Sequence, residues 1–572
     1  MLSPFPISAG LGQLSPDSLR GALENFLPKD VTSEKKIRAI EAALKSPAGE
    51  AMRETMARWI VDEIVPVGSL VPESYSKWRL PVRDAMVFVV TRLSSARLAP
   101  KLLEQVELPA DTRPEERLLR LIAKVPGLQK LGQVIARNQH LRPALRRALA
   151  RLENGIRDVS AEEIHAIIRR NLGERMERFA VKIAPGILSE ASVSAVVRFT
   201  WHNPESGRRE NGVFKVLKPH IPEYFAEDME YLQGLAEYFA ERQHTYGFPA
   251  RLIPDTFRKV RRLLRYEVNF RREQKTLIEA AELYRSMSGV RIPRLIGPLC
   301  TPEMTALSEE RGIKITSAVT RLPATRRRQV AEQLIEALVA VPLFAATQEA
   351  IFHGDPHAGN LLYDQHTGQL CIIDWALRER LGRAERRHLT LLFLMVSLRD
   401  PVGASGEIIG LSRQGIKRNS PRARMIHELA RDFLQSIPAS KLPSAADAMR
   451  LLERVALKGI RFPASLIMLS KVMFTLEGIL GDVVGLDTAI GLAIARRVAG
   501  HWLANRRAYR SPLETRDWVT LQCSALLYAG RLWVEWEQTV LNRLLKPKGT
   551  SISAPGVVAA ATGAGQSAGK TS

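Results

Sequence analysis

The stretch Ile351–Ala376, which reads IFHGDPHAGNLLYDQHTGQLCIIDWA, constrains this chain more than any other part of it. It holds Asp355, then Asn360 at the spacing D-x-x-x-x-N, and finally Asp374. Two apolar runs flank the turn at residues 366–368, and this pattern predicts a short β-hairpin. Asp355 and Asn360 would then lie on the loop before the hairpin, and Asp374 would directly follow its second strand.

These three polar side chains suit phosphoryl transfer. That reaction needs in-line positioning and hard oxygen ligands that hold Mg²⁺ against phosphate oxygens. A loop carboxylate can orient the attacking hydroxyl or water, while an amide oxygen and a second carboxylate can hold the metal. Protein kinases assign these roles to H-R-D-x-x-x-x-N and D-F-G, for which this chain has HGD, Asn360 and DWA. The alternative is a capped turn in which Asp and Asn bind only backbone groups.

A lysine on a predicted strand is the next candidate. The run Ile187–Thr200, a polar turn and the run Gly212–Leu217 predict two antiparallel strands. Lys215 lies inside the second run, where a lysine usually snorkels or pairs, but in a kinase-like sheet it would grip nucleotide phosphates. No G-x-G-x-x-G occurs, and three small residues could let backbone amides approach phosphate instead: Ser189, Ala191 and Ser192.

Two further strings lie on predicted helices. The predicted helix Arg258–Met287 carries Glu267 and Glu273, and either acid could pair with a strand lysine or belong to an ordinary i,i+4 charge ladder. Lys130 and Gln133 are three positions apart and share a helix face. By themselves they are typical of a solvated helix surface.

Composition narrows the class of partner. The chain has 572 residues, 45% of them hydrophobic, which is enough for several domains with cores. Its formal net charge of +23 favours anionic partners. Nucleic acid ranks lower, because there is no zinc-finger spacing and no basic stripe interleaved with aromatic residues. Three widely separated cysteines fit a reduced intracellular compartment.

The remaining sequence is largely helical in pattern. Amphipathic periodicity predicts helices at residues 33–44, 49–64 and 82–103, and again from about residue 383 to 508. The N-terminus lacks the pattern of a secretory signal. No window reaches the roughly 18 to 20 apolar residues that a spanning helix needs, so we expect peripheral membrane contact at most. The Gly-, Ala- and Ser-rich stretch from Lys546 predicts a disordered tail.

The central stretch resembles two families. One is the aminoglycoside/choline phosphotransferase group, whose loop is similar to HGDPHAGN with a later IDW. The other is the UbiB/AarF family of atypical kinase-like proteins, ubiquinone-biosynthesis type, which four further strings favour. KLGQ at residues 130–133 resembles its KxGQ signature, FKVLKP at 214–219 its VKVQRP strand, and EVNFRRE at 267–273 its ExD helix, while TLEG at 475–478 resembles a recurring C-terminal string. Their order along the chain agrees with the family.

The resemblance implies an α+β fold, namely an atypical protein-kinase-like bilobal fold with a large helical N-terminal extension and a helical C-terminal region. The implied parts are a helical region (1–110), a KxGQ-type extension (111–185), an N-lobe (186–315), a C-lobe (316–510), an amphipathic helix (511–545) and a disordered tail (546–572).

The resemblance also implies roles for single residues. ATP or ADP and Mg²⁺ would be the cofactors, with Lys215 on phosphate, Glu273 as its ion-pair partner and Asp355 as the catalytic carboxylate. Asn360 and Asp374 would be metal ligands. The small residues Ser189, Ala191 and Ser192 would approach the nucleotide, and a regulatory set would meet over the cleft: Lys130, Gln133 and Glu267.

The sequence departs from the family at three places. The nucleotide loop, usually AAAS, reads SEAS, and Glu190 would repel phosphate unless it turns away or is bridged by metal. The aspartate of ExD is Asn269, and D-F-G reads DWA. These changes bear on nucleotide preference and control of the cleft rather than on the metal and catalytic positions.

The first functional hypothesis is a Mg-ATP-dependent atypical kinase or ATPase that supports ubiquinone or other isoprenoid-lipid metabolism. We expect it to be cytoplasmic and peripheral to the inner membrane, with an anionic lipid or isoprenoid-lipid precursor as partner. Nucleic acid is not expected, and a homo-oligomer stays open. The alternatives are a small-molecule phosphotransferase, which has no use for KLGQ and EVNFRRE, and a nucleotide-binding scaffold without turnover.

Overall fold

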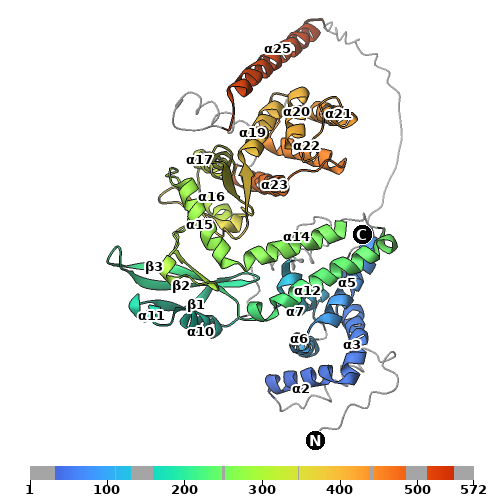
Figure 1. Ribbon diagram of the computed structural model, residues 1–572, viewed down its shortest axis with the longest axis vertical. Helices are drawn as coiled ribbons and strands as arrows, with labels where there is room; N and C mark the ends of the chain where they lie inside the picture. Colours follow the sequence, from blue (N-terminus) through green and yellow to red (C-terminus); the bar gives the residue numbers. More distant parts are fainter. Residues whose placement is uncertain are drawn as a thin grey trace, which may run out of the picture.

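The computed structural model describes residues 32–71, 73–109, 111–130, 159–247, 252–345, 347–438, 443–484 and 512–545. Gln133 and the rest of residues 131–158 in the predicted KxGQ extension, residues 485–511 and the predicted tail lie outside the described residues. The described part has an N-terminal helical region, an antiparallel sheet with its own helix, a long helical middle and a large helical C-terminal half (Figure 1).

The N-terminal helical region lies beneath helices α12 and α14 in Figure 1. Its apolar faces form a shared core with those two helices, including Phe88, Leu98, Leu232 and Leu264. The predicted helix at residues 82–103 is in fact two helices, which separate at Leu93 and Ser94. The elements are α2 (Ser33–Lys45), α3 (Pro47–Trp59), the π-helix η2 (Ile60–Ile64), α4 (Val67–Leu70), the 3-10 helix η3 (Glu73–Trp78), α5 (Arg79–Arg92), α6 (Ser95–Glu107) and α7 (Pro114–Ile122).

A four-stranded antiparallel sheet follows, in the order β1-β2-β3-β5. Helix α10 buries its isoleucines against one face, where Phe199 and Phe214 stack with their ring centroids 3.8 Å apart. Lys215 lies on β3, in register with Val196 of β2 and Thr305 of β5. The predicted antiparallel pair is confirmed in part as β2 and β3. The predicted run Ile187–Thr200 is divided between β1 and β2, and the two strands extend into the predicted turn. The bounds are α10 (Ala161–Leu172), α11 (Arg175–Arg178), β1 (Lys182–Glu190), β2 (Ser194–Asn203), β3 (Arg208–Leu217) and β5 (Met304–Ser308).

The helical middle joins the sheet to the C-terminal half. The prediction of a single helix over Arg258–Met287 is wrong, because the helix is interrupted at Val268 and Asn269. Asn269 caps the second helix, and its side-chain oxygen accepts a hydrogen bond of 3.0 Å from the backbone N–H of Arg272. These elements are α12 (His220–Glu241), α13 (Gln243–Tyr246), α14 (Leu252–Glu267) and α15 (Phe270–Tyr284).

The C-terminal half carries the central stretch between helices. The predicted hairpin is confirmed as β8 (Leu361–Asp364) and β9 (Gln369–Ile372), which pair antiparallel. A second small sheet pairs β7 (Glu349–His353) with β10 (Arg378–Gly382). The remaining elements are β4 (Val290–Arg291), η5 (Gly297–Leu299), β6 (Ile313–Lys314), α16 (Ile315–Val319), α17 (Ala324–Ile335), η6 (Glu336–Ala340), α18 (Val341–Leu343), η7 (Ala358–Asn360), α19 (Arg383–Ser397), α20 (Pro401–Leu411), α21 (Pro421–Ser436), α22 (Ala445–Leu457) and α23 (Ala464–Val484).

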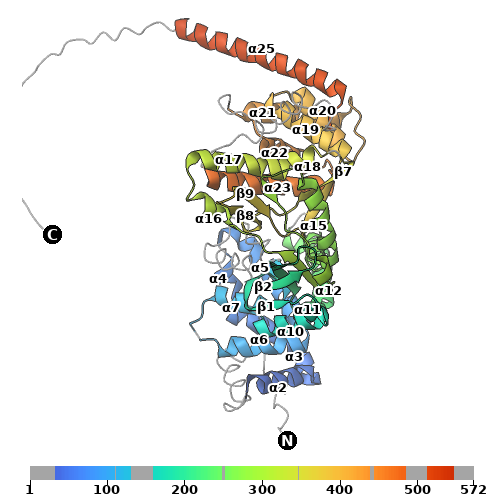
Figure 2. The ribbon, with the colours of Figure 1, turned by 90° about the vertical axis from the view of Figure 1, so that its left-hand side faces the viewer.

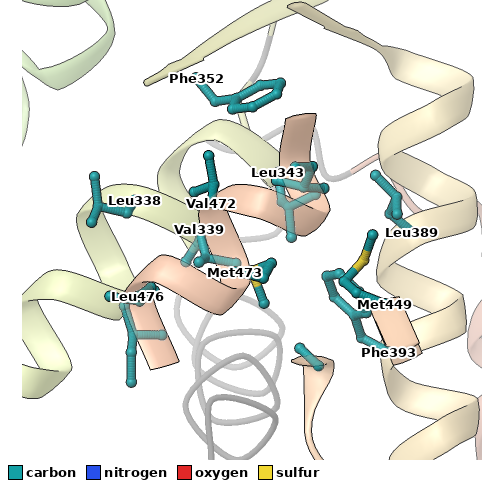
Figure 3. Packing of buried hydrophobic residues seen from close by; sticks show 14 of the residues in the cluster. Leu338, Val339, Leu343, Phe352, Leu389, Phe393, Met449, Val472, Met473 and Leu476 are labelled. Atoms are coloured by element: carbon teal, nitrogen blue, oxygen red, sulfur yellow. The ribbon is translucent and has the colours of Figure 1, made fainter. Parts of the chain in front are cut away.

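The core of this half surrounds helix α23. Figure 3 shows Val472, Met473 and Leu476 of α23 among side chains from the neighbouring helices and from β7. All three are fully buried, and so is Phe352, which directly precedes the D-x-x-x-x-N loop. The core therefore fixes α23 and the start of this loop relative to each other.

Helix α25 (Thr515–Leu545) runs outward from the C-terminal half in both views (Figure 2). Its first turns are held by an ion pair between Asp517 and Arg387 and by a 2.9 Å hydrogen bond from Ser524 Oγ to Asp400. Further along, large apolar side chains are exposed. No helix among the described residues combines the length and the apolar character needed to cross a bilayer.

Candidate active site

A three-membered ionic cluster joins the antiparallel sheet to the C-terminal half. Lys215 Nζ on β3 lies 2.7 Å from Glu273 Oε1 on α15 and 2.8 Å from Asp374 Oδ1 after β9. Glu273 is 2% exposed at its side chain, whereas Asp374 is 44% exposed. The cluster is therefore closed on the helix side and open on the side of Asp374. The structure thus brings the predicted strand lysine, one of the two predicted helix acids and the predicted metal-binding aspartate into direct contact.

Burial and charge set the protonation of this cluster. Burial opposes ionisation of Asp374, but the charge of Lys215 and its hydrogen bond outweigh it and lower the pKa of Asp374 to about 2. Burial raises the pKa of Glu273 to about 7, because Lys215 offsets it only in part and Asp374 adds a like charge. Burial would lower the pKa of Lys215, yet the two carboxylates raise it above its ordinary value. Lys215 and Asp374 thus carry charge at neutral pH, while Glu273 is poised between two states.

The imidazole ring of His353 links the loop that carries Asp355 to Asp374 through hydrogen bonds. The backbone N–H of Asp355 donates to His353 Nδ1 at 3.2 Å, so the proton of the neutral ring lies on Nε2. Nε2 lies 3.1 Å from the carbonyl of Ile373 and 3.0 Å from that of Asp374. Burial is the main cause that lowers the pKa of His353, which keeps the ring neutral in this role.

Asn360 closes the same unit from the other side. Its side-chain N–H₂ donates to the backbone carbonyl of Asp355 at 3.1 Å, and the backbone carbonyl of Asn360 accepts from the backbone N–H of Ile373 at 2.9 Å. The amide nitrogen is therefore used within the loop, which leaves the oxygen as the end of the amide suited to a hard cation. Asp355, Asn360 and Asp374 thus belong to one hydrogen-bonded unit.

The DWA string is held by a residue that sequence reasoning missed. Arg272, next to Glu273 on α15, donates to the carbonyl of Ala376 at 2.7 Å and to that of Arg378 at 3.2 Å. Trp375 is completely buried, donates to the carbonyl of Ile372 at 3.0 Å and packs its ring on His353. Asp374 itself has φ +60°, a conformation that costs energy for most residues but that Asp tolerates better than most. Helix α15 therefore positions both the partner of Lys215 and the segment after Asp374, the predicted metal ligand.

The predicted nucleotide loop lies at the β1–β2 turn. Ser189 and Ala191 are exposed, and Ser192 is buried. Glu190, whose charge was expected to repel phosphate, pairs with Lys218 at 3.0 Å, and both side chains are almost completely buried. The repulsion is therefore largely neutralised by a lysine three positions after Lys215, within the FKVLKP string.

The predicted regulatory contact is present in part. Lys130 Nζ forms an ion pair with Glu267 Oε1, and the other carboxylate oxygen of Glu267 lies 3.4 Å from Ser192 Oγ. Gln133 lies outside the described residues. Since Ser192 belongs to the predicted nucleotide loop, the KLGQ segment reaches this loop through a single glutamate.

A second missed residue lies opposite the catalytic loop. Lys471 Nζ on α23 is 2.7 Å from Asp355 Oδ1. The sequence signal that could have found it is its place four residues before the TLEG string, but nothing local links that helix to the loop.

The donor set fits a magnesium-bound phosphate in composition. Among the described residues, no three His, Cys, Asp or Glu side chains gather as a metal site. Mg²⁺ in phosphoryl-transfer sites is held by one or two protein oxygens together with substrate phosphates, and Asp374 and Asn360 offer such oxygens. Asp374 and Asn360 would hold such a metal, and it would supply positive charge that neutralises a bound phosphate.

Fold and side chains together define a kinase-like domain: a sheet with a strand lysine, a helix with its glutamate partner, and a helical half that carries D-x-x-x-x-N and a later Asp. Residues 151–404 match the ABC1 atypical kinase-like domain. The chain therefore carries a kinase-like domain of this description over fewer than half of its residues, which confirms the resemblance read in the sequence.

Individual relatives are distant. A chloroplast protein of Arabidopsis thaliana named ACTIVITY OF BC1 COMPLEX KINASE 7 is 25% identical over 358 residues, 62% of this chain and 50% of that protein. A Haemophilus ducreyi protein named "Probable protein kinase UbiB" is 24% identical over 365 residues, 60% of each. The matches thus span only half to three fifths of these curated relatives.

A solved structure of the Mycobacterium tuberculosis protein Rv3197 with erythromycin aligns with a TM-score of 0.43 at 17% identity, covering 66% of this chain and 90% of that one. This score is too low to support an argument about the fold. The assignment rests on the family match and on the architecture above.

Proposed function

We propose that this protein is a Mg-ATP-dependent atypical kinase or ATPase of the UbiB kind. The observation that carries the proposal is the contact of Lys215 with both Glu273 and Asp374, beside the unit that holds Asp355 and Asn360. Phosphoryl transfer depends on positioning and on charge stabilisation, and these residues offer a cation for phosphate, oxygens for Mg²⁺ and a carboxylate for the acceptor. The cofactors would be ATP or ADP and Mg²⁺.

Each residue has a defined part in the proposed reaction. Lys215 would bind phosphate oxygens, with Glu273 holding its ammonium in place. Asp374 and Asn360 would hold the metal, and Asp355 would orient the acceptor oxygen and take its proton. His353 keeps the backbones of Asp355 and Asp374 together, so that acceptor and metal keep one relative position.

The contact of Lys130 with Glu267 favours this proposal over a small-molecule phosphotransferase of the aminoglycoside/choline type. A phosphotransferase of that type has no use for the KLGQ string, whereas here the string reaches the nucleotide loop through Glu267 and Ser192. The third reading, a nucleotide-binding scaffold without turnover, has no observation in its favour, because all three catalytic and metal-binding side chains are retained.

We infer a membrane surface as the place of action and an isoprenoid-lipid precursor or anionic lipid as partner. Helix α25 supports this proposal: five exposed apolar residues recur at spacings of seven and one, which places them on one face. They are Val519, Leu526, Leu527, Trp533 and Val534. Together with the net charge of +23, such a face suits the interface of an anionic bilayer. Ubiquinone metabolism is suggested by the relatives named UbiB.

A nucleotide panel tests the enzyme proposal. Melting temperature and ATP turnover are measured with ATP, ADP and GTP, with and without Mg²⁺, and with and without anionic vesicles or isoprenoid-precursor mimics. We expect Mg-ATP or Mg-ADP to raise the melting temperature of the wild type, and Asp355→Asn to keep this shift while it loses turnover. A shift without turnover in both proteins under every condition would favour the scaffold.

A sedimentation test addresses the membrane proposal. The protein should co-sediment with anionic vesicles in a salt-sensitive manner, and replacing Leu526 and Trp533 together by serine should weaken the binding. Equal binding to neutral vesicles, or no effect of the double substitution, would contradict the role given to α25.

A further inference from the structure

Helix α23 brings a lysine to the catalytic loop from far along the chain. Three of its residues, Val472, Met473 and Leu476, are fully buried in the core that also contains Phe352 (Figure 3). Lys471 directly precedes Val472, so its backbone is fixed by this packing. Its side chain is 25% exposed and meets Asp355, whose side chain is 15% exposed.

Helix α23 comes close to the loop at Gly354. Gly354 stands where protein kinases have the arginine of H-R-D. A Cβ at this position would lie 3.3 Å from the carbonyl oxygen of Leu377 and 3.6 Å from Met468 Cγ on α23. Met468 and Lys471 are three positions apart and share a helix face. One turn of α23 therefore flanks both Gly354 and Asp355.

The catalytic loop itself supplies no lysine or arginine. Between Asp355 and Asn360 it reads Pro-His-Ala-Gly, and the histidine, His357, accepts a hydrogen bond from the backbone N–H of Gly359 at 3.0 Å. The other lysine of the site, Lys215, lies against Glu273 and Asp374. Among the described residues, Lys471 is a cation that the structure places beside Asp355, on the acceptor side of the site.

We propose that Lys471 is a phosphoryl-positioning residue: its ammonium orients the carboxylate of Asp355 and donates a hydrogen bond to the phosphoryl group in transfer. An ammonium has three N–H donors, so it can serve both oxygens. This inference rests on the proposed function and adds to it a cation, delivered by a helix of the C-terminal half, that neither the D-x-x-x-x-N string nor the strand lysine supplies.

The proposed step transfers the γ-phosphoryl group of ATP to the acceptor oxygen. The acceptor oxygen, of water or of a hydroxyl, forms a bond to the γ-phosphorus of ATP while the bond from that phosphorus to the β–γ bridging oxygen breaks. The acceptor proton passes to Asp355, and ADP leaves with the electron pair. Lys471 neither gains nor loses a proton.

Such a cation should matter more for the transferred group than for the bound nucleotide. A contact made mainly in the transition state changes kcat rather than KM. Removing one donor aimed at developing charge typically costs about 10² to 10³ in kcat. Mg-ADP has no γ-phosphoryl group, so its binding should not depend on Lys471.

The experiment compares the wild type with Lys471→Met, Lys471→Arg and the control Lys458→Met, which removes an exposed lysine of the same half. We measure kcat and KM for Mg-ATP, and melting temperature with Mg-ADP alone and with Mg-ADP plus aluminium fluoride, which imitates the phosphoryl group in transfer. We expect Lys471→Met to lower kcat about a hundredfold or more with KM changed less than about threefold. It should keep the Mg-ADP shift and lose the additional shift from aluminium fluoride. Lys471→Arg should restore part of kcat, and Lys458→Met should behave as the wild type.

Other outcomes overturn the inference. A Lys471→Met protein with wild-type kcat, or one that keeps the aluminium fluoride shift, would show that the pair with Asp355 is only structural. A rise in kcat would show that Lys471 restrains Asp355 instead of assisting it. If the wild type shows no Mg-ADP shift at all, the proposed function fails first and the inference falls with it. The Mg-ADP shift of the variant also reports whether it is folded.

Discussion

Two ionic clusters in this protein contain the same set of charges, one cation and two carboxylates, but their surroundings differ. In the site, Lys215 faces Glu273 and Asp374. In the helical region, Arg97 on α6 faces Asp228 on α12 at 2.6 Å and Glu227 at 3.5 Å. Each has one cation between two carboxylates. Both Arg97 and Asp228 are at most 3% exposed, whereas Asp374 is 44% exposed.

The second cluster, called here the Arg97 clamp (Arg97, Glu227 and Asp228), is closed by backbone groups. The N–H of Gly127 donates to Asp228 at 2.9 Å, the N–H of Ser94 donates to Glu227 at 2.8 Å, and Arg97 donates to the carbonyl of Lys124 at 3.2 Å. A Cβ at Gly127 would collide with the hydroxyl of Tyr231. The clamp therefore joins α6, α12 and the segment that leads to KLGQ, and offers no open face to a ligand.

The greater exposure of one member, Asp374, distinguishes the candidate site from the Arg97 clamp, which is a structural joint. A buried ion pair costs desolvation and is weak evidence for net stability, but removing one partner leaves an uncompensated charge. In the Arg97 clamp, the loss of one partner therefore lowers the free energy of unfolding. In the candidate site, under the proposed function, the open member Asp374 would share its charge with a bound metal and phosphate, so the cost of removing it would fall on function.

The largest effect on stability is expected from the clamp. Asp228→Asn leaves Arg97 without its closest carboxylate, and unfolding free energy should fall by about 3 to 5 kcal/mol. Denaturant unfolding measures the loss, with Glu227→Gln as control, since Glu227 is 22% exposed and lies farther from Arg97. A loss under about 1 kcal/mol would show that the clamp is not the joint described here.

Asp374→Asn tests the other half of the comparison. It should abolish most of the melting-temperature shift with Mg-nucleotide and lower turnover by about a hundredfold or more, because a metal ligand and a partner of Lys215 are lost. Stability without nucleotide should fall by less than in Asp228→Asn, because Asp374 is partly open to solvent. An unchanged Mg-nucleotide shift would remove Asp374 from the metal site.

Glu273→Gln tests the protonation state of the site through the pH dependence of stability. Because burial raises the pKa of Glu273 to about 7 from an ordinary value of 4.5, the folded protein holds a proton there that the unfolded chain has released. This contribution to stability is fully present below pH 4.5 and is lost as pH rises through about 7, at no more than about 1.4 kcal/mol per pH unit. The nucleotide-free wild type should therefore lose stability relative to Glu273→Gln between pH 5 and 7.5. A constant difference across this range would contradict a raised pKa.

The smallest effect is expected at the contact between KLGQ and the nucleotide loop. Lys130→Ala removes the partner of Glu267, which also meets Ser192, and should change turnover or the preference between ATP and ADP by about threefold to tenfold, the size of a modest coupling energy. Arg120→Ala, on an exposed part of α7, serves as control. Identical kinetics would make KLGQ an ordinary helix surface.

Local patterns predicted the parts of the site that are local. The hairpin of β8 and β9 followed from two apolar runs and a turn, and the place of Lys215 on a strand followed from alternation. The helix Arg258–Met287 was predicted wrongly, since periodicity continues through Val268 and Asn269 while the cap of Asn269 starts a new helix. Capping competes with helix continuation, and the periodicity of apolar residues does not record it.

The sequence alone predicted which reactive side chains are present: Asp355 and Asn360 on a loop, Asp374 after it, a lysine on a strand and acids on a helix. Their order along the chain resembles one family. Only the tertiary structure decided which acid meets which lysine. Glu273 meets Lys215 across 58 positions, Glu267 meets Lys130 across 137, and Asp355 meets Lys471 across 116. The physical reason is that periodicity reports which face of an element is buried, while the packing of α15 and α23 against the two sheets sets which side chains meet.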